Sequence, residues 1–443
     1  MPTISRPPFL WGTATASYQI EGATTEDGRG PSIWDTFSHT PGKIDRGETG
    51  DIACDHYHRY KEDIQLMREL GVQAYRFSIS WSRLIPDGKG QQNPKGFDFY
   101  NRLVDNLLAA DITPFATLFH WDLPQALQDM GGFTSRDISA WFADYAVQVA
   151  DRLGDRVRHW IMLNEPSVYA LIGHGLGVHA PGLSDLKAFF AVTHHLNLAQ
   201  GKAIQALRSV NSSLQLGTTL NLQRGFPADD SKASAVMAER HSDLWNGCFL
   251  GPLLAGAYPE RIVPEIAPYI QEGDLGLAQQ PIDFLGINHY SRAYIQPSKD
   301  AIVGYEEAAL PPDVPRTSFE WEINPTEFRD VLLEVHERYK HPPIYVTENG
   351  AFFIDTVSPD GRVHDEKRIA FLDSYIQAME QARVRGVDIR GYFVWSLLDN
   401  FEWAAGYRPT FGIVKVDYKT QRRIPKDSYF WYQNHIKKVG SRN

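Results

Sequence analysis

The sequence contains very little cysteine: its 443 residues include only Cys54 and Cys248. Two cysteines cannot build a disulfide framework, which favours a reducing compartment, so we expect a cytoplasmic protein. Residues 1–8 lack the apolar stretch of a signal peptide. No run of about 18 apolar residues, the length that crosses a membrane, is present either. These absences predict a protein without a membrane partner.

Positive charge is not in excess, since 44 Lys and Arg face 54 Asp and Glu and the net charge is −10. A negatively charged chain is disfavoured as a nucleic-acid partner. The sequence shows no linker, repeat or low-complexity segment, so we expect residues 1–443 to form a single domain. No Gly-rich phosphate loop follows a predicted strand, which weakens the case for an open doubly wound sheet.

What the sequence does contain is a regular alternation of strands and helices. Short apolar, β-branched or aromatic runs predict strands at residues 9–17, 74–81, 113–121, 157–165, 214–222, 282–290, 343–348 and 389–396. Helical spacing predicts helices ending at Gly71, around Phe99 to Leu107, after an N-cap at Ser135, at 186–210, 231–247 and 326–340, around Ile369 to Met379, and at 428–439. The proline-rich residues 292–325 are predicted to form a long irregular loop.

Eight strands alternating with eight helices predict an α/β fold, a single (β/α)8 TIM barrel with long strand-to-helix loops. Function in such barrels lies at the carboxyl ends of the strands. Glu165 and Glu348 end the fourth and seventh strands, where a buried carboxylate is costly unless a partner stabilises it. Two carboxylates at one cleft suit glycoside hydrolysis: one attacks the anomeric carbon and the other protonates the leaving oxygen.

Further polar and aromatic side chains fall at strand ends. Each alone is more often structural, but together their types can hold hydroxyl groups and stack on sugar rings. These candidates are Gln19, His120, Trp121, Asn288, Tyr290, Trp395, Glu402 and Trp403. Arg76, on the second strand, brings positive charge to this end of the barrel, either beside an active-site carboxylate or in a structural ion pair.

At this point the chain resembles glycoside hydrolase family 1, the β-glucosidase and β-galactosidase family. The resemblance runs from residues 9–22 to residues 425–428 and includes Asn164-Glu165-Pro166 and Thr347-Glu348-Asn349-Gly350. It implies a retaining β-glucosidase, also active on β-galactosides and β-fucosides, with a part in cellulose degradation. The implied substrate is a small-molecule β-glycoside or short oligosaccharide, and neither a metal nor an organic cofactor is implied.

The resemblance also implies a role for each candidate. Glu348 would be the nucleophile and Glu165 the general acid/base, with Tyr290 and Arg76 tuning Glu348 and Asn288 in a supporting place. The residues implied to hold the substrate are Gln19, His120, Trp121, Asn164, Trp395, Glu402 and Trp403, with Trp321 on the aglycone side and Phe411 near the 6-hydroxyl.

Three positions depart from the family's usual sequence. His289 replaces a common Tyr, and strand alternation predicts that it points away from the site. Thr410 stands where Arg usually precedes Phe-Gly, so the loop near the 6-hydroxyl should differ, and the residues after Trp321 are also unusual. Glu402, with no lysine close behind it, predicts a preference for unphosphorylated glucosides over their 6-phosphates.

Two other classes of protein compete with this interpretation. A metal-dependent hydrolase would have to use the histidine pairs His56 and His58 or His194 and His195. The first pair is predicted in a long loop and the second within a helix, which favours hydrogen-bonded or solvated side chains over metal ligands. A catalytically inactive sugar-binding barrel is disfavoured because both carboxylates are intact. The sequence leaves the oligomeric state open.

Overall fold

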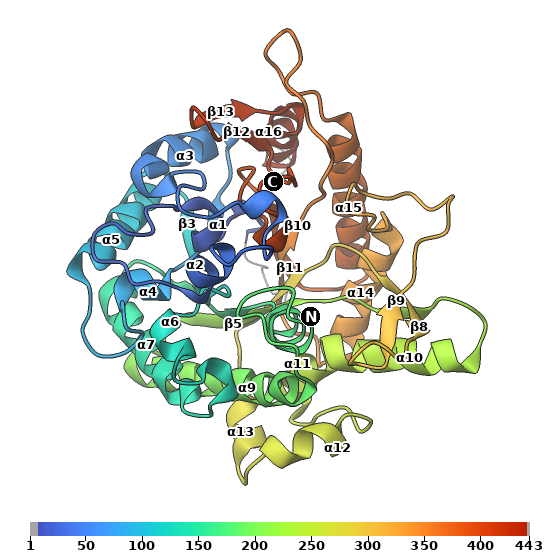
Figure 1. Ribbon diagram of the computed structural model, residues 1–443. Helices are drawn as coiled ribbons and strands as arrows, with labels where there is room; N and C mark the ends of the chain where they lie inside the picture. The colour runs from blue at the N-terminus through green and yellow to red at the C-terminus, as the bar shows by residue number, and fades with distance from the viewer. Residues whose placement is uncertain (1–7, 441–443) are drawn as a thin grey trace, which may run out of the picture.

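A closed barrel of eight parallel strands forms the centre of the computed structural model, which describes residues 8–440 (Figure 1). Neighbouring strands run in the order β1, β2, β3, β4, β5, β7, β10 and β11, and β11 closes the ring by pairing with β1. The strands are β1 Leu10–Ala14, β2 Ala74–Ser78, β3 Thr113–Phe119, β4 His159–Asn164, β5 Gln215–Asn221, β7 Phe284–Asn288, β10 Ile344–Asn349 and β11 Ile389–Trp395. The predicted (β/α)8 barrel is confirmed.

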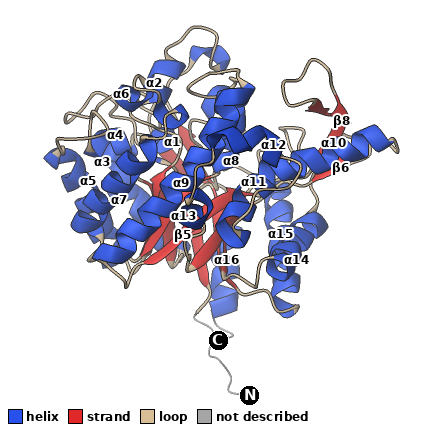
Figure 2. Ribbon diagram, turned by 90° about the horizontal axis from the view of Figure 1, so that it is seen from below, coloured by secondary structure: helices blue, strands red, loops and turns tan. Residues whose placement is uncertain are grey.

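The predicted helices are present between the strands, and most surround the barrel (Figures 1 and 2). They are α3 His56–Leu70, α5 Pro94–Ala109, α7 Ile138–Leu153, α9 Leu186–Val210, α10 Lys232–Ser242, α14 Pro325–Arg338, α15 Glu366–Val384 and α16 Asp427–Gly440. Short helices lie in the loops: α1 Ser17–Ile20, α2 Ile33–Ser38, α4 Trp81–Leu84, α6 Gln125–Gln128, α8 Pro166–Ala170, α11 Cys248–Leu250, α12 Val263–Ile266 and α13 Asp274–Ala278. Within the described residues, no helix is long and apolar enough to span a membrane.

A small extra sheet corrects the prediction for residues 292–325. Part of this segment forms β8 (Ala293–Pro297) and β9 (Tyr305–Glu307), which pair with each other and, through β8, with β6 (Gly225–Pro227). Figure 2 shows β6, β8 and α10 standing to one side of the barrel. Helix α10 packs against β6 and β8, and its residues Ser234, Ala238 and His241 are buried. A second pair, β12 (Val414–Asp417) and β13 (Arg422–Pro425), precedes α16.

Helix ends follow local chemistry, with one correction. Helix α3 stops at Gly71, whose φ of 83° is readily adopted only by glycine. The predicted N-cap at Ser135 is wrong, because α7 begins later, with Asp137 at its N-cap position. His56 and His58 lie in the first turn of α3 rather than in the preceding loop, since that helix begins earlier than its apolar stripe indicates.

The inside of the barrel is filled mainly by aromatic rings. Phe115, Phe284, Tyr345 and Phe393 belong to one buried cluster, with ring centroids 5.0–6.4 Å apart. This cluster closes the barrel below the carboxyl ends of the strands. Arg76 lies two residues beyond Ala74 on the same face of β2 and is fully buried. The aromatic layer therefore forms an apolar base beneath the charged groups.

Candidate active site

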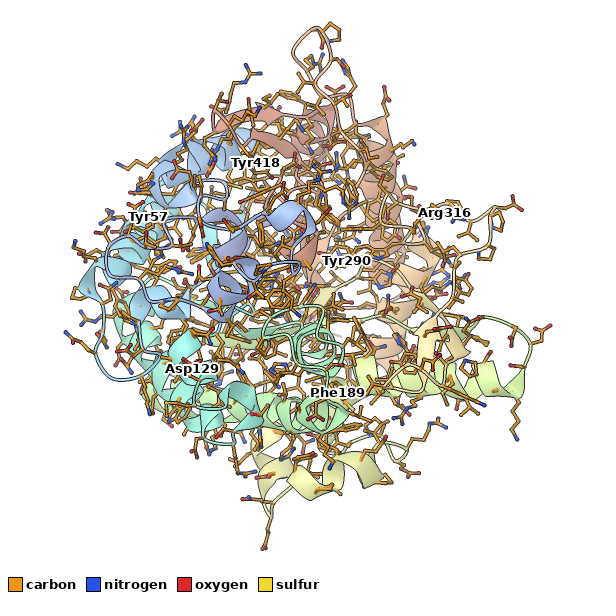
Figure 3. The ribbon with its side chains drawn as sticks, viewed as in Figure 1. Tyr57, Asp129, Phe189, Tyr290, Arg316 and Tyr418 are labelled. Carbon is orange, nitrogen blue, oxygen red and sulfur yellow. The ribbon has the colours of Figure 1, made fainter. Side chains whose placement is uncertain are left out.

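The side chains singled out at strand ends meet around one cavity of about 650 Å³. Figure 3 shows one of them, Tyr290, near the middle of the ring of helices. Those that line the cavity are His120, Trp121, Glu165, Tyr290, Trp321, Glu348, Trp395, Glu402, Trp403 and Phe411. The other four predicted residues, Gln19, Arg76, Asn164 and Asn288, hydrogen-bond to residues that line it.

Glu348 is held by partners on both of its oxygens. Arg76 donates to Oε1 in a buried ion pair, and the Tyr290 hydroxyl donates to Oε2 at 2.6 Å. The pairing of β10 with β7 shifts register between Val346 and Glu348, and a bulge of this kind changes the direction of a side chain. A cation and a hydroxyl donor thus hold the two oxygens of this carboxylate in place.

Glu165 has different surroundings. Its Oε1 accepts hydrogen bonds from the amides of Asn288 at 2.7 Å and Asn221 at 3.1 Å, and no cation of residues 8–440 forms an ion pair with it. Burial and the negative charge of Glu348 raise the pKa of Glu165 to about 8. Its φ of 44° places the backbone in the left-handed region, directly before Pro166 at the start of α8. Such strain is found where the surrounding structure fixes a functional side chain.

Asn164 joins the two carboxylate environments. Its Oδ1 accepts hydrogen bonds from Arg76 at 2.5 Å and Asn288 at 3.2 Å, and its Nδ2 lies 2.8 Å from Nε2 of His120. Burial, followed by the charge of Arg76, lowers the pKa of His120 well below its usual value, so its ring is neutral. The Nε2 of His120 therefore accepts from Asn164, and its Nδ1–H has no partner among the described residues.

Another part of the wall carries a second set of polar groups. Gln19 donates to Oδ1 of Asn400 at 3.0 Å and to Glu402 at 3.4 Å, while its own Oε1 has no partner among the described residues. Burial, followed by the negative charge of Glu348, raises the pKa of Glu402 to about 8. The carboxyl group of Glu402 is thus mostly protonated at neutral pH and can donate a hydrogen bond.

The residues near Phe411 show what the unusual sequence positions do. Phe411 packs against Tyr290 and Trp321, with ring centroids at 6.1 and 6.2 Å. Thr410 turns its hydroxyl to the backbone carbonyl of Phe353 at 2.6 Å. His289 points away from the cavity, as predicted: its Nδ1 lies 2.8 Å from the carbonyl of Leu222, and its ring stacks on Phe328 in α14.

The outer part of the cavity was not predicted from the sequence. We call it the mouth and define it by Ile172, Leu176, Val178, Ala301 and Val303, which line the cavity. Ile172 lies in a short π-helix, Leu171–Gly175, and the other four lie on loops. Leu176 is 38% exposed and Val178 53% exposed, so apolar surface faces solvent there. Asn221, which contacts Glu165, was also missed, although it ends a barrel strand and the strand-end rule could have found it.

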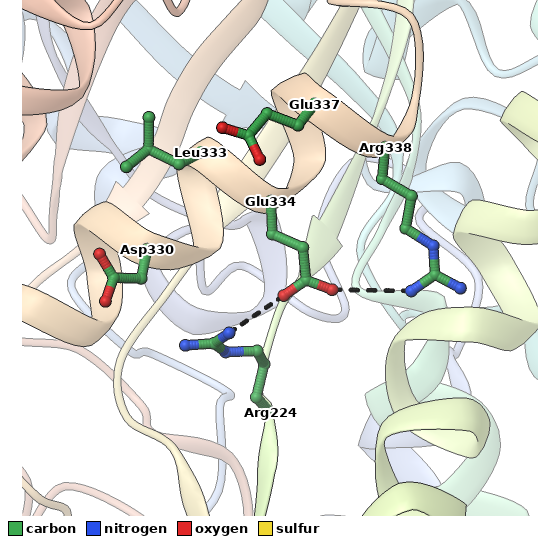
Figure 4. Close-up of a pocket in the computed structure, with 6 residues that line it drawn as sticks. All are labelled: Arg224, Asp330, Leu333, Glu334, Glu337 and Arg338. Atoms are coloured by element: carbon green, nitrogen blue, oxygen red, sulfur yellow. Dashed lines mark hydrogen bonds and ion pairs between the residues drawn. The ribbon is translucent and has the colours of Figure 1, made fainter.

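Other candidate sites in the described residues carry less chemistry. A shallow hollow lined by residues of α14 and by Arg224 holds ion pairs from Glu334 to Arg224 and Arg338, at 3.1 and 3.6 Å (Figure 4). The charged groups of Arg224, Glu334 and Arg338 therefore already have ion-pair partners. No group of three or more His, Cys, Asp or Glu placed to hold a metal ion occurs within residues 8–440. His56 instead bonds Asp63 at 2.7 Å, and His194 bonds Asp274 at 2.8 Å.

Comparison with known proteins identifies a family and several similar proteins for this chain. The family model for glycosyl hydrolase family 1 matches residues 4–441. Beta-glucosidase A of Thermotoga maritima is 49% identical over 439 residues, covering 98% of this chain and 97% of that protein. The 1,4-beta-D-glucan glucohydrolase of Thermotoga neapolitana is 48% identical, covering 98% of each. A solved structure of the T. maritima β-glucosidase in complex with deoxynojirimycin matches with a TM-score of 0.93 and 48% identity, covering 98% of this chain and 99% of that one.

Proposed function

Because this chain belongs to glycosyl hydrolase family 1, we propose that it is a β-glucosidase that removes terminal, non-reducing β-D-glucosyl residues with retention of configuration. The observation that carries the proposal is the pair Glu165 and Glu348 on one cavity in opposite environments. Glu348 is paired with Arg76 and Tyr290, whereas burial and the charge of Glu348 raise the pKa of Glu165 to about 8. One carboxylate is therefore suited to attack and the other to donate a proton.

The first step forms a covalent glycosyl-enzyme. The Glu348 carboxylate attacks the anomeric carbon, the bond to the leaving oxygen breaks, and Glu165 gives its proton to that oxygen. Arg76 and Tyr290 hold the carboxylate of Glu348 in place for the attack. The spacing of the two carboxyl groups that suits this route is about 5–5.5 Å.

The second step is hydrolysis of that intermediate. Glu165, now ionised, takes a proton from water, whose oxygen attacks the same carbon and releases Glu348. In the intermediate Glu348 is an uncharged ester, so the charge that raises the pKa of Glu165 in the free enzyme is absent. Because Glu165 must be protonated in the first step, kcat/KM should fall above about pH 8.

The sugar is proposed to bind at the polar end of the cavity, which we define by Gln19, His120, Asn164 and Glu402. The unpartnered Oε1 of Gln19 and Nδ1–H of His120 are free to bond hydroxyl groups, and buried polar groups without partners are uncommon unless a ligand completes them. Asn164 would hold the 2-hydroxyl. Trp121, Glu402 and Trp403 would complete the glycone subsite, with Trp395 as its floor, Phe411 near the 6-hydroxyl and Trp321 on the aglycone side.

The lack of a cation among the described cavity-lining residues favours unphosphorylated sugars. None of the described residues that line the cavity is a lysine or an arginine. A 6-phosphate would therefore be buried beside Glu402 without a cation to pair with it, which is costly. We propose that unphosphorylated β-glucosides are strongly preferred over their 6-phosphates.

The proposed substrates are small β-glycosides and short oligosaccharides, including those released from cellulose, and one site can admit β-galactosides and β-fucosides as well. Neither a metal nor an organic cofactor has a step in the carboxylate mechanism. We also propose a single domain, because β1 pairs with β11 and α16 packs against α3 and α15. Two unpaired, buried cysteines support a cytoplasmic location.

Assay with p-nitrophenyl β-glucoside, with and without exhaustive chelation, tests the proposal. We expect equal rates in both samples, and a rate that falls above about pH 8 as Glu165 ionises. Activity lost on chelation and restored by added metal would refute the carboxylate mechanism. An absence of activity on β-glucosides, β-galactosides and β-fucosides alike would refute the function itself.

A further inference from the structure

A buried charge cluster lies behind the part of the wall that carries Phe411. It consists of Lys426, Arg368, Asp355, Asp365 and Asp399, and each of these residues is almost fully inaccessible to solvent at its side chain. The cluster joins the loop after β10, the loop after β11, helix α15 and the residue before α16. Figure 1 shows α15 and α16 side by side near β12 and β13.

The cluster fixes the backbone on both sides of Phe411. On one side, Lys426 donates to Oδ1 of Asp399 at 2.8 Å, and the same oxygen accepts the backbone N–H of Gly412 at 2.9 Å. On the other side, Arg368 donates to the backbone carbonyl of Thr410 at 2.5 Å. Lys426 also contacts Asp355 at 2.5 Å, and Asp355 in turn contacts Arg368 at 2.8 Å. Lys426 and Arg368 therefore share the carboxylate of Asp355, which links the contacts on the two sides of Phe411.

The fit at Gly412 leaves little room for adjustment. A Cβ atom at this position would lie 2.1 Å from the backbone nitrogen of Asp399, so only glycine allows the two segments to approach this closely. Thr410 adds a further tie through its hydroxyl bond to Phe353 at 2.6 Å. Phe411 is thus placed by its neighbours and then packs against Tyr290, which bonds Glu348.

We propose that Lys426 is a positioning residue that sets selectivity for the substituent at carbon 6 of the sugar, by holding Asp399 and through it the backbone of Phe411. This inference rests on the proposed β-glucosidase function, in which Phe411 lies near the 6-hydroxyl. Lys426 is not among the cavity-lining residues and does not touch the substrate. Without its cation, Asp399 is left as a buried carboxylate that lacks its ammonium partner, and the loop around Phe411 rearranges.

The test compares p-nitrophenyl β-glucoside with p-nitrophenyl β-xyloside, which lacks carbon 6 and its hydroxyl. Lys426→Met should lower the glucoside-to-xyloside ratio of kcat/KM by about tenfold, the lower end of what the fit of one small substituent in an apolar pocket is worth. A role limited to stability would lower both substrates alike and leave the ratio unchanged. Lys426→Arg, which keeps the cation, should restore part of the ratio.

Two further variants keep the test decisive. Thr410→Val keeps the shape of the side chain and removes only the bond to Phe353, so it should fold and lower the ratio in the same direction by a smaller factor. Asp274→Asn is the control: it weakens another ion cluster, in which the buried Asp274 bonds Arg136 and His194, and none of these three residues is bonded to residues 396–412. Its ratio should equal that of the wild type.

The outcomes separate this inference from the proposed function. If the wild type hydrolyses the glucoside and neither Lys426→Met nor Thr410→Val changes the ratio by more than about twofold, the inference is wrong and the function stands. If the wild type hydrolyses neither substrate, the proposed function itself fails.

Discussion

The two ends of the cavity are built on different principles. The inner end, which we define as Glu165, Glu348 and their direct partners Arg76, Asn221, Asn288 and Tyr290, is buried and closely hydrogen-bonded. The mouth is apolar and partly exposed, and all of its residues except Ile172 lie on loops.

The difference separates two tasks of the enzyme. Groups that attack or transfer a proton must be held before the substrate arrives, which explains the dense bonding at the inner end. The mouth has no such requirement, and its apolar surface gains from covering any apolar part of the aglycone. Substitutions at the inner end should therefore alter the chemical steps, and substitutions at the mouth should alter the choice of leaving group.

The largest effect is expected at Glu348. Glu348→Gly removes the atom that forms the covalent intermediate, so kcat should fall by at least about 10⁴-fold on every glycoside. Added azide should attack from the face that Glu348 vacates and give the α-glycosyl azide. Glu334→Gln, in the hollow of Figure 4, is a suitable control and should keep full activity. A comparable fall of kcat in Glu348→Gly and Glu334→Gln would contradict a specific chemical role for Glu348.

Glu165 should show a smaller and substrate-dependent loss. Glu165→Ala removes proton transfer, worth about 10²–10⁴-fold for leaving groups that need a proton. Dinitrophenol leaves without an acid, so the glycosyl-enzyme should still form from its glycoside and then break down slowly. Azide should accelerate that breakdown and give the β-glycosyl azide, as product analysis can show. An α product from this variant would require the two assignments to be exchanged.

The mouth should give the smallest effects, visible only as a trend. For alkyl β-glucosides from butyl to octyl, kcat/KM should rise with chain length, by no more than about fourfold per methylene. Val178→Ser should flatten this slope because it replaces apolar surface at the mouth. Val384→Ser, on α15 at a residue 87% exposed and outside the cavity lining, should leave the slope unchanged. A wild-type slope of zero would contradict an apolar mouth.

The same contrast explains how far the sequence could predict the molecule. Barrel strands are short, buried and bounded by turn signals, so their ends could be located and polar residues there, such as Glu165 and His120, could be assigned to one cleft. The register shift beside Glu348 could not be predicted, because a bulge depends on pairing with β7. The bonds of Arg76 to Glu348 and Asn164 also join segments far apart in the chain.

Loop regions were predicted less well for a physical reason. The structure of a loop depends on which tertiary contacts satisfy its backbone, and local sequence carries little of that information. Residues 292–325 look irregular in sequence, yet β8 forms because β6 and α10 supply a pairing edge and a packing surface. Ser135 has the right chemistry for an N-cap, but α7 begins after Asp137. Leu176 and Val178 carried no signal of a role at the mouth.

The most direct test of the account is the stereochemistry of the first product. The anomeric proton of the released sugar can be followed by NMR early in the hydrolysis of a β-glucoside, before mutarotation mixes the anomers. If Glu348 is the nucleophile and Glu165 the acid/base, two displacements at one carbon predict that the β anomer forms first. Initial formation of the α anomer would show a single displacement by water and would contradict a covalent role for Glu348.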